Sequence, residues 1–376
     1  MHERFAADLA ELADRGRLRA LRDRTGIDFS SNDYLGLAES EELRLAAADA
    51  IARGVPVGAG GSRLLRGNQF EHELLEAEAA DYFGAETALY FGGGFVANYS
   101  IFSTLPQRGD LVVHDELIHA SVHEGLRSGR ADHVGVPHNN VDAFDAAIVR
   151  WRAAGGKGRP WISVESLYSM DGDSPDIAGL FAVADRHEAM VVVDEAHATG
   201  VLGPQGRGLA AAFEGRGNVI TLHTCGKALG TVGGFILAPR TIRDFLVNRA
   251  RPFIFATAPS PLVAAITRAA LHISKTDPER RECLAQLVQF ASAELRRVCG
   301  AEPSGSQIMP IIIGADRAAV AVAASLQARG FDVRAIRPPT VPEGTSRLRI
   351  ALTLNVDEAT VADLFAAMAE EMRKAA

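Results

Sequence analysis

The sequence is poor in cysteine and has no cluster of basic residues. Three of its 376 residues are cysteine, at positions 225, 283 and 299, and no two of them form a CxxC pair. An odd number of cysteines without that spacing does not favour a disulfide framework or a zinc site. The formal net charge is -8, and the Lys and Arg residues are scattered. The composition therefore does not favour nucleic-acid binding, which needs clustered basic residues to neutralise phosphates.

Long hydrophobic runs are also missing. No stretch approaches the roughly 20 apolar residues of a membrane-spanning helix. The opening "MHERFAADLAELADRGRL" carries acidic residues throughout and lacks the apolar segment of a signal peptide, and it does not match a transit peptide. Its Phe5, Leu9 and Leu12 suit one face of a helix. We therefore expect a cytoplasmic protein with no membrane partner.

The composition is that of an ordinary globular protein, with 47% hydrophobic and 23% charged residues. Through the first two thirds of the chain, short apolar runs alternate with helix-like segments. These runs occupy residues 88–91, 111–113, 161–166, 190–194, 219–224 and 233–238. Buried apolar strands separated by helices predict an α/β fold, with a mostly parallel sheet covered by helices on both faces.

The pattern changes after Pro261. A helix-like region rich in Arg, Leu and Ala (262–299) leads to strand-like segments at 308–314, 331–336 and 346–353. Helices are expected between and after these strands, which predicts a smaller α+β domain. The sequence thus divides into an N-terminal helical segment (1–36), a large α/β domain (37–265) and a C-terminal α+β domain (266–376).

Polar residues follow several of the predicted strands. In open α/β sheets, functional groups gather beyond the carboxyl ends of the strands. That rule brings together Asp115, His119, Glu165 to Ser169, Asp194, and Thr224 to Lys227. The stretch "FGGGFVAN" (91–98) belongs to the same edge. Its glycines lie between a strand and a helix, where the helix N-terminus offers N–H groups to an anion such as phosphate, although a triple glycine can equally be a tight turn.

Two other nucleotide motifs compete for the same glycines and lysine. Gly92, Gly94 and Ala97 satisfy a loose dinucleotide pattern, and Asp115 stands about 20 residues later, where a ribose-binding acid is expected. A nicotinamide-dependent dehydrogenase is therefore an alternative, but it leaves Asp194 and Lys227 without a role. A P-loop is excluded, because Thr221 occupies the required glycine position and Ala228 follows Lys227.

The run "VVVDEAHATG" (191–200) ends a buried strand with Asp194, whose burial must be compensated. Lys227 could bind an aldehyde cofactor as a Schiff base, and pyridoxal phosphate needs a carboxylate to keep its ring nitrogen protonated. Asp194 could serve that purpose, with His197 near the phenolic oxygen. Singly, these residues could equally be a helix cap, a loop histidine and a surface lysine. Together with an upstream phosphate loop, they favour a pyridoxal phosphate site.

Seven stretches, in order, resemble the α-oxoamine synthases, pyridoxal phosphate enzymes of fold type I. They are "FSSNDYLGLA" (29–38), "GAGGSRLLRGN" (58–68), "FGGGFVANYS" (91–100), "ELIHASVHEGL" (116–126), "ESLYSMDGD" (165–173), "DEAHATGVLGPQGRG" (194–208) and "TCGKALGTVGG" (224–234). The closing "AIRPPTVPEGTSRLRIALT" (335–353) looks most like the members that join L-alanine to a pimeloyl thioester in biotin synthesis. Members that use glycine or serine, and a non-catalytic subunit of the family, are alternatives; Lys227 argues against the non-catalytic one.

The resemblance implies a role for each of the following residues around the cofactor. Lys227 would anchor the cofactor and remove the α-proton of the substrate, Asp194 would pair with the ring nitrogen, and His119 would stack on the ring. His197 and Ser169 would contact the phenolic oxygen, and Gly94, Phe95 and Thr224 would hold the phosphate. Thr257 would reach the phosphate of the neighbouring subunit in a homodimer.

For the substrates, the resemblance implies that Arg349 receives the alanine carboxylate, to which a guanidinium fork is suited. In a strand, Arg347 points the same way as Arg349, so the choice between them comes from the resemblance alone. Thr340 and Arg19 would line the side of the acyl donor, whose carrier is coenzyme A or an acyl carrier protein. Because this sequence is short around Arg19, Arg22 is an alternative to it. His119 would also contact substrate.

Overall fold

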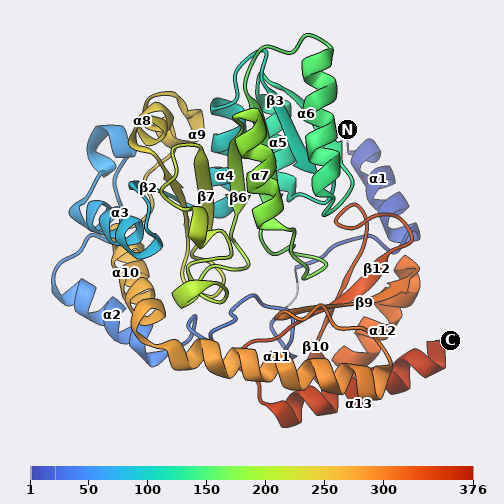
Figure 1. Cartoon of the computed structure of the whole chain (residues 1–376). Coiled ribbons are helices and arrows are strands. Elements are labelled where there is room, and N and C mark those ends of the chain that lie inside the picture. The colour runs from blue at the N-terminus through green and yellow to red at the C-terminus, as the bar shows by residue number, and fades with distance from the viewer. Residues whose placement is uncertain (1, 22, 376) are drawn as a thin grey trace. The chain divides into compact units, whose positions relative to one another are not determined.

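A computed structural model describes residues 2–21 and 23–375 of the chain. Contacts between residues divide the chain into two compact units. The larger unit comprises residues 35–168 and 174–281, and the smaller unit comprises residues 1–34, 169–173 and 282–376. Figure 1 gives the labels of the elements within both units.

The larger unit is built on a seven-stranded sheet with the order β2-β8-β7-β6-β5-β3-β4. Only β8 runs antiparallel to its neighbours, and all other pairs are parallel. The strands are β2 (Thr87–Phe91), β3 (Leu111–Asp115), β4 (Asp132–Val136), β5 (Pro160–Glu165), β6 (Met190–Asp194), β7 (Val219–Thr224) and β8 (Gly234–Ala238). Every residue of the strands other than β4 is buried, as expected for a sheet that is covered on both faces.

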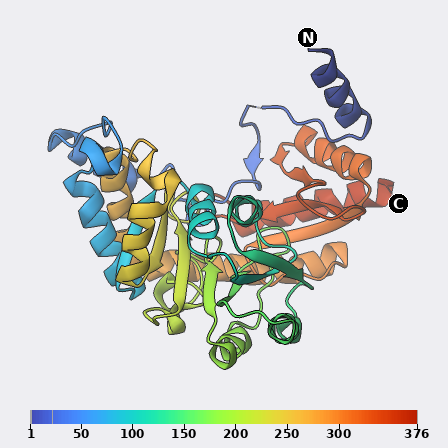
Figure 2. The same cartoon turned by 90° about the horizontal axis from the view of Figure 1, so that it is seen from above.

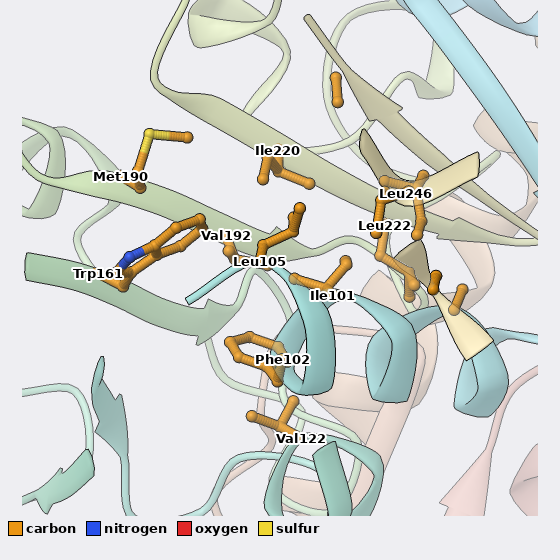
Figure 3. Close-up of a cluster of buried hydrophobic side chains, with 14 of the residues drawn as sticks. Ile101, Phe102, Leu105, Val122, Trp161, Met190, Val192, Ile220, Leu222 and Leu246 are labelled. Carbon is orange, nitrogen blue, oxygen red and sulfur yellow. The ribbon is translucent and has the colours of Figure 1, made fainter. Parts of the chain in front are cut away.

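Helices cover both faces of this sheet, and each face has its own apolar core (Figure 2). One core joins β5, β6 and β7 to α4 (Gly94–Thr104), α5 (Ala120–Ser128), α8 (Arg240–Arg249) and α9 (Arg251–Ile254). Figure 3 shows this core, in which Ile101 of α4 lies toward Val192 of β6 and Leu222 of β7, and Phe102 of α4 lies beside Val122 of α5. The other core is formed with α6 (Val141–Ala153) and α7 (Ile177–His187).

Three further helices complete the larger unit: α2 (Glu41–Ala52), α3 (Phe70–Phe83) and α10 (Pro261–Thr276). Short helical turns occupy Arg63–Gly67, Pro204–Gly206 and Ala211–Phe213. Side-chain caps begin several helices, because a cap oxygen satisfies a backbone N–H that has no partner within the helix. Ser40, Asn140, Asp176 and Ser260 accept such bonds at the starts of α2, α6, α7 and α10.

The smaller unit contains an antiparallel sheet with the order β11-β12-β9 and a parallel pair, β1-β10. Its strands are β1 (Ile27–Asp28), β9 (Ile308–Gly314), β10 (Phe331–Asp332), β11 (Arg334–Ile336) and β12 (Ser346–Ala351). Its helices are α1 (Glu3–Asp14), α12 (Asp316–Ala328) and α13 (Glu358–Ala375), and α11 (Pro278–Cys299) contains the division between the two units.

The predicted fold class is confirmed: a mostly parallel sheet covered by helices, a smaller α+β part and an N-terminal helix are all present. The units differ from the expected domains of 1–36, 37–265 and 266–376 in two respects. Helix α10 packs against α2 and α3 within the larger unit, and residues 1–34 and 169–173 pack with the C-terminal part. Three local details also differ from expectation: β4 was not predicted, 331–336 forms two short strands, and 262–299 forms two helices separated at Asp277.

Candidate active site

Polar side chains meet at the carboxyl edge of the large sheet. Strands β3, β6 and β7 end at Asp115, Asp194 and Thr224, and the loop between β2 and α4 contributes Gly92 and Gly93. Because β3, β5, β6 and β7 are parallel, their carboxyl ends lie along one edge, which is where open α/β sheets bind ligands.

Asp194 is held in a buried setting by two donors. Asp194 is 6% exposed. Its Oδ1 accepts the backbone N–H of Ala196 at 2.9 Å, and its Oδ2 accepts the side-chain amide of Asn98 at 2.7 Å. These bonds offset part of the cost of burying a carboxylate and fix the direction in which its oxygens point.

Lys227 is connected to Asp194 through Thr224 and Ala196. The Nζ of the half-buried Lys227 donates to the Thr224 hydroxyl at 3.5 Å. That hydroxyl donates in turn to the carbonyl of Ala196 at 3.3 Å, and the N–H of the same residue binds Asp194. Ala196 therefore links the end of β7 to the carboxylate at the end of β6. His197 follows in the same loop and is 6% exposed.

His119 forms the cap of α5. Its Nδ1 accepts the backbone N–H of Ser121 at 3.2 Å and lies 2.7 Å from the hydroxyl of the same serine. The ring of Phe95 meets the imidazole edge to face, with centroids 6.3 Å apart. Desolvation lowers the pKa of His119; the charge of Asp194 opposes this effect and that of Lys227 adds to it. The structure thus brings His119 into electrostatic reach of both charged residues.

The glycine loop approaches the end of β7 closely. A Cβ atom on Gly94 would lie 2.5 Å from Cγ2 of Thr224, a distance that real Cβ atoms do not show. A Cβ atom on Gly92 or Gly93 would meet no atom within 4 Å in the described chain. Gly94 therefore packs the start of α4 against Thr224, while the two preceding glycines leave open space in front of the N–H groups that begin the helix.

These residues fit pyridoxal phosphate by the chemistry of their donors. A buried carboxylate suits a protonated ring nitrogen, an amine suits an aldehyde, and a helix N-terminus with open space and a nearby hydroxyl suits a phosphate. In addition, the Oδ1 atom of the buried Asn98 accepts no hydrogen bond from any residue that the structure describes. A polar ligand at this edge is consistent with such an atom.

The smaller unit contains Arg347 and Arg349, which are both buried on β12 but differ in their partners. Arg347 forms an ion pair with Asp171. Arg349 donates to the carbonyl of Ser169 at 2.6 Å and to the side chain of Asn32 at 3.0 Å. Within residues 2–21 and 23–375, no carboxylate pairs with Arg349. Of the two arginines, Arg349 is therefore the one whose positive charge no described carboxylate neutralises.

The remaining predicted residues are exposed, as His119 and Phe95 are. Arg19 lines a cavity of about 560 Å³ in the smaller unit together with Arg334 and Arg337. Thr340 and Thr257 are exposed, the former in the smaller unit and the latter between α9 and α10 of the larger one. The alternative to Arg19, Arg22, lies outside the described residues.

Asp115 is not available to a ribose. Its carboxylate accepts the N–H groups of Leu117 and Asn139, both at 2.8 Å, and lies 2.9 Å from Nδ1 of His138. Asp115 is also 0% exposed, so a ribose could not reach the acceptor position that these three contacts leave. Burial acts to raise the pKa of Asp115, but the hydrogen bonds hold it below its usual range.

The sequence interpretation missed Asn98 and Ser121. Asn98 lies on α4 one turn after Gly94, and Ser121 lies two residues after His119; both are buried. The Asn98 amide donates to Asp194 and, at 3.0 Å, to the Ser121 hydroxyl. The available signal was an asparagine on an otherwise apolar helix face directly after the glycine loop.

In the part of the chain that the structure describes, no helix has both the length and the apolar character that crossing a bilayer requires.

The chain is similar to proteins of one class. Residues 24–368 match the family Aminotransferase class I and II, so the chain belongs to that family, and its relatives place it among the α-oxoamine synthases of fold type I. The 8-amino-7-oxononanoate synthase of Anaeromyxobacter dehalogenans (strain 2CP-1 / ATCC BAA-258) is 43% identical over 346 residues, which cover 91% of this chain and 85% of that protein. The 8-amino-7-oxononanoate synthase of Geobacter sulfurreducens is 38% identical and covers 98% of both chains.

Solved structures agree with this assignment. A serine palmitoyltransferase from S. paucimobilis, bound to pyridoxal phosphate and myriocin, matches with a TM-score of 0.89, 27% identity, and coverage of 100% of this chain and 98% of that chain. The 8-amino-7-oxononanoate synthase of Francisella tularensis matches with a TM-score of 0.79 and 25% identity, covering 94% of this chain and 99% of that chain. The predicted family is thereby confirmed.

Proposed function

We propose that the chain is a pyridoxal phosphate-dependent C-acyltransferase that condenses L-alanine with a pimeloyl thioester and releases carbon dioxide, in biotin biosynthesis. The observation that carries this proposal is the similarity to 8-amino-7-oxononanoate synthases, which are 38–44% identical over 87–98% of the chain. The donor set at the carboxyl edge of the large sheet supports the same cofactor.

Residues of the larger unit would hold the cofactor. Asp194, fixed by Asn98 and Ala196, would accept the hydrogen of the ring nitrogen, and His119 would lie over the ring. Gly94, Phe95 and Thr224 would hold the phosphate at the start of α4. When bound, the cofactor supplies an electron sink that allows the α-proton of an amino acid to be removed. His197, with Ser169 of the smaller unit, would contact the phenolic oxygen.

Lys227 would have two roles. Its amine would bind the cofactor aldehyde, and once displaced by alanine it would take the α-proton of the substrate. The Thr224 hydroxyl, 3.5 Å from Nζ, would keep the amine close to the reacting carbon in both roles.

Residues of the smaller unit would recognise the substrates. Arg349 would bind the alanine carboxylate with its guanidinium fork, since no carboxylate of the described chain neutralises it. Arg19 and Thr340 would face the acyl donor, a pimeloyl thioester of coenzyme A or of an acyl carrier protein. We further propose a cytoplasmic homodimer in which Thr257 reaches the phosphate of the neighbouring subunit.

The test is a product assay combined with a spectrum. The purified protein, supplied with pyridoxal phosphate, pimeloyl-CoA and L-alanine, should form 8-amino-7-oxononanoate, detected by mass spectrometry. Its visible band should respond more strongly to alanine than to glycine or serine. Equal or better turnover with glycine or serine and a different acyl thioester would assign the chain to another branch of the α-oxoamine synthases.

A further inference from the structure

A continuous hydrogen-bond chain joins Asp194 to His119. The Nδ2 of Asn98 donates to Oδ2 of Asp194 at 2.7 Å and to Oγ of Ser121 at 3.0 Å. The same Oγ lies 2.7 Å from Nδ1 of His119. Asn98 and Ser121 are 2% and 0% exposed, so water does not compete for the bonds of the Asn98 amide, whereas the residue at the other end, His119, is exposed.

The position of each proton in this series of hydrogen bonds can be assigned from the groups that must donate. A backbone N–H always carries a hydrogen, so Nδ1 of His119, which accepts the N–H of Ser121, presents its lone pair. A neutral imidazole with a bare Nδ1 has its proton on Nε2. The Ser121 hydroxyl accepts a hydrogen from Asn98 and can therefore direct its own hydrogen to Nδ1.

The charge of Asp194 sets the direction of the whole chain. If the Asn98 amide were reversed, its oxygen would face the carboxylate, and two acceptors would repel each other. With the NH₂ group toward Asp194, the second hydrogen of that group reaches Ser121. A proton added at Nδ1 of His119 would then face two donors, the backbone N–H and the hydroxyl of Ser121, so the imidazolium is disfavoured.

We propose that Asn98 and Ser121 are positioning residues that transmit the negative charge of Asp194 to His119 and hold this histidine as the neutral tautomer with its proton on Nε2. His119 then offers one N–H donor to the site and does not exchange protons through Nδ1. The value of this arrangement to catalysis rests on the proposed function, whereas the tautomer itself is a property of the chain.

The other charged groups that face His119 do not assign its tautomer. Desolvation disfavours the imidazolium, Asp194 favours it, and Lys227 disfavours it. His123, on the same helix, interacts electrostatically with His119 as well. Each of these influences acts on the net charge of the ring, and only the contacts at Nδ1 distinguish one nitrogen from the other.

The test is ¹⁵N NMR of the full chain, loaded with pyridoxal phosphate and labelled at the histidine ring nitrogens, with His119 assigned by His119→Gln. The wild-type ring should show the Nε2–H tautomer at pH 8. Asn98→Leu frees the Ser121 hydroxyl to accept a hydrogen from Nδ1. Because the backbone N–H of Ser121 still faces Nδ1, we expect this variant to keep the Nε2–H tautomer when neutral but to show a titration raised by about one pH unit, as for loss of a hydrogen bond that favours the neutral form.

Three further variants make the result decisive. Ser121→Ala removes the hydroxyl between Asn98 and His119, so its spectrum tests the proposal even if Asn98→Leu does not fold. Ser121→Thr keeps a hydroxyl at this position and should show the wild-type spectrum. The control is Ser100→Ala, because Ser100 is buried on the same helix as Asn98 but its hydroxyl donates to the Val96 carbonyl and takes no part in the bonds between Asp194 and His119. A wild-type ring protonated on Nδ1 would overturn the proposal, as would spectra of Asn98→Leu and Ser121→Ala that match Ser100→Ala. If the wild-type spectra are as expected but the protein does not condense alanine with the pimeloyl thioester, the proposed function is refuted and the tautomer assignment stands.

Discussion

Gly94 and Thr224 are in closest contact where the glycine loop meets the end of β7, since a Cβ atom at position 94 would stand 2.5 Å from Cγ2 of Thr224. Two segments that are far apart in the sequence thus fix each other beside the start of α4. The contact leaves no room for even one methyl group, so the position of the helix N-terminus depends on it.

Gly94→Ala should therefore weaken cofactor binding. Overpacking a tight contact costs about 1–3 kcal/mol, which corresponds to a dissociation constant for pyridoxal phosphate raised roughly 5- to 150-fold. Removing the opposing methyl group with Thr224→Ser, which keeps the hydroxyl, should restore most of the affinity in the double variant. Gly217→Ala is the matched control, because a Cβ there meets nothing within 4 Å in the described chain. Affinity that is unchanged in Gly94→Ala would show that the contact does not position the helix.

Arg349→Ala should impair alanine binding selectively. Loss of a charged hydrogen-bonding partner costs about 1.5–3 kcal/mol, so the KM for L-alanine should rise by about 10- to 150-fold, with a smaller change in the KM for the acyl donor. Arg349→Lys keeps the positive charge but not the guanidinium fork, so its KM for L-alanine should lie between those of the wild type and Arg349→Ala. Arg347→Ala is the comparison on the same strand: its guanidinium is already paired with Asp171, so this variant should lose stability and keep its affinity for alanine. The assignment fails if Arg347→Ala shows the larger KM effect.

Lys227→Ala should bind pyridoxal phosphate without a covalent link. Borohydride treatment would then fix no cofactor to the chain, and turnover should fall by about 10²- to 10⁴-fold or more through loss of the base alone. Lys275→Ala, which removes an exposed lysine paired with Asp81 on another part of the larger unit, should keep both the label and the activity. Mass spectrometry of peptides after borohydride reduction checks the site directly. A label that persists in Lys227→Ala would place the anchor elsewhere.

Strands buried on both faces were predictable because their β-branched runs leave no polar alternation. The intervals 190–194 and 219–224 match the buried strands β6 and β7 residue for residue, and 308–314 matches β9, which is buried only in part. Strand β4 was missed because four of its five residues are exposed, and its Asp and Gly residues have low strand preference. The strand forms by pairing with β3 at the edge of the sheet. The 331–336 run is divided at Val333 because β10 pairs with β1, whereas β11 pairs with β12 in a different sheet.

The site was predictable in part for a related reason. Asp194 and Thr224 end strands that the sequence reveals, and the rule of carboxyl ends then brings them together. Asn98 binds a residue 96 positions later, a contact that no local pattern encodes. The different partners of Arg347 and Arg349 were equally hidden, because strand periodicity points both side chains the same way and only the fold supplies Asp171 to one of them.

His223 makes the stability of the protein depend on pH. Its ring is 1% exposed and packs on Phe83 with centroids 3.9 Å apart, and burial lowers its pKa to about 3. In the unfolded chain this histidine titrates near pH 6.5. Above that pH it is neutral in both states and contributes nothing to the pH dependence. As the pH falls below 6.5, His223 binds a proton in the unfolded state but stays neutral in the folded state, so the free energy of unfolding decreases.

At pH 5 the loss from His223 should be about 2 kcal/mol relative to pH 8. Denaturant unfolding of the wild type and of His223→Gln at both pH values isolates this contribution as the difference between the two pH dependences, whatever His223→Gln costs in packing. Phe83→Leu removes the ring beneath His223 but keeps the imidazole, so it should be destabilised and still show most of the wild-type pH dependence. If His223→Gln loses as much stability between pH 8 and pH 5 as the wild type does, the buried imidazole is not the group that responds, because a glutamine cannot take up the proton.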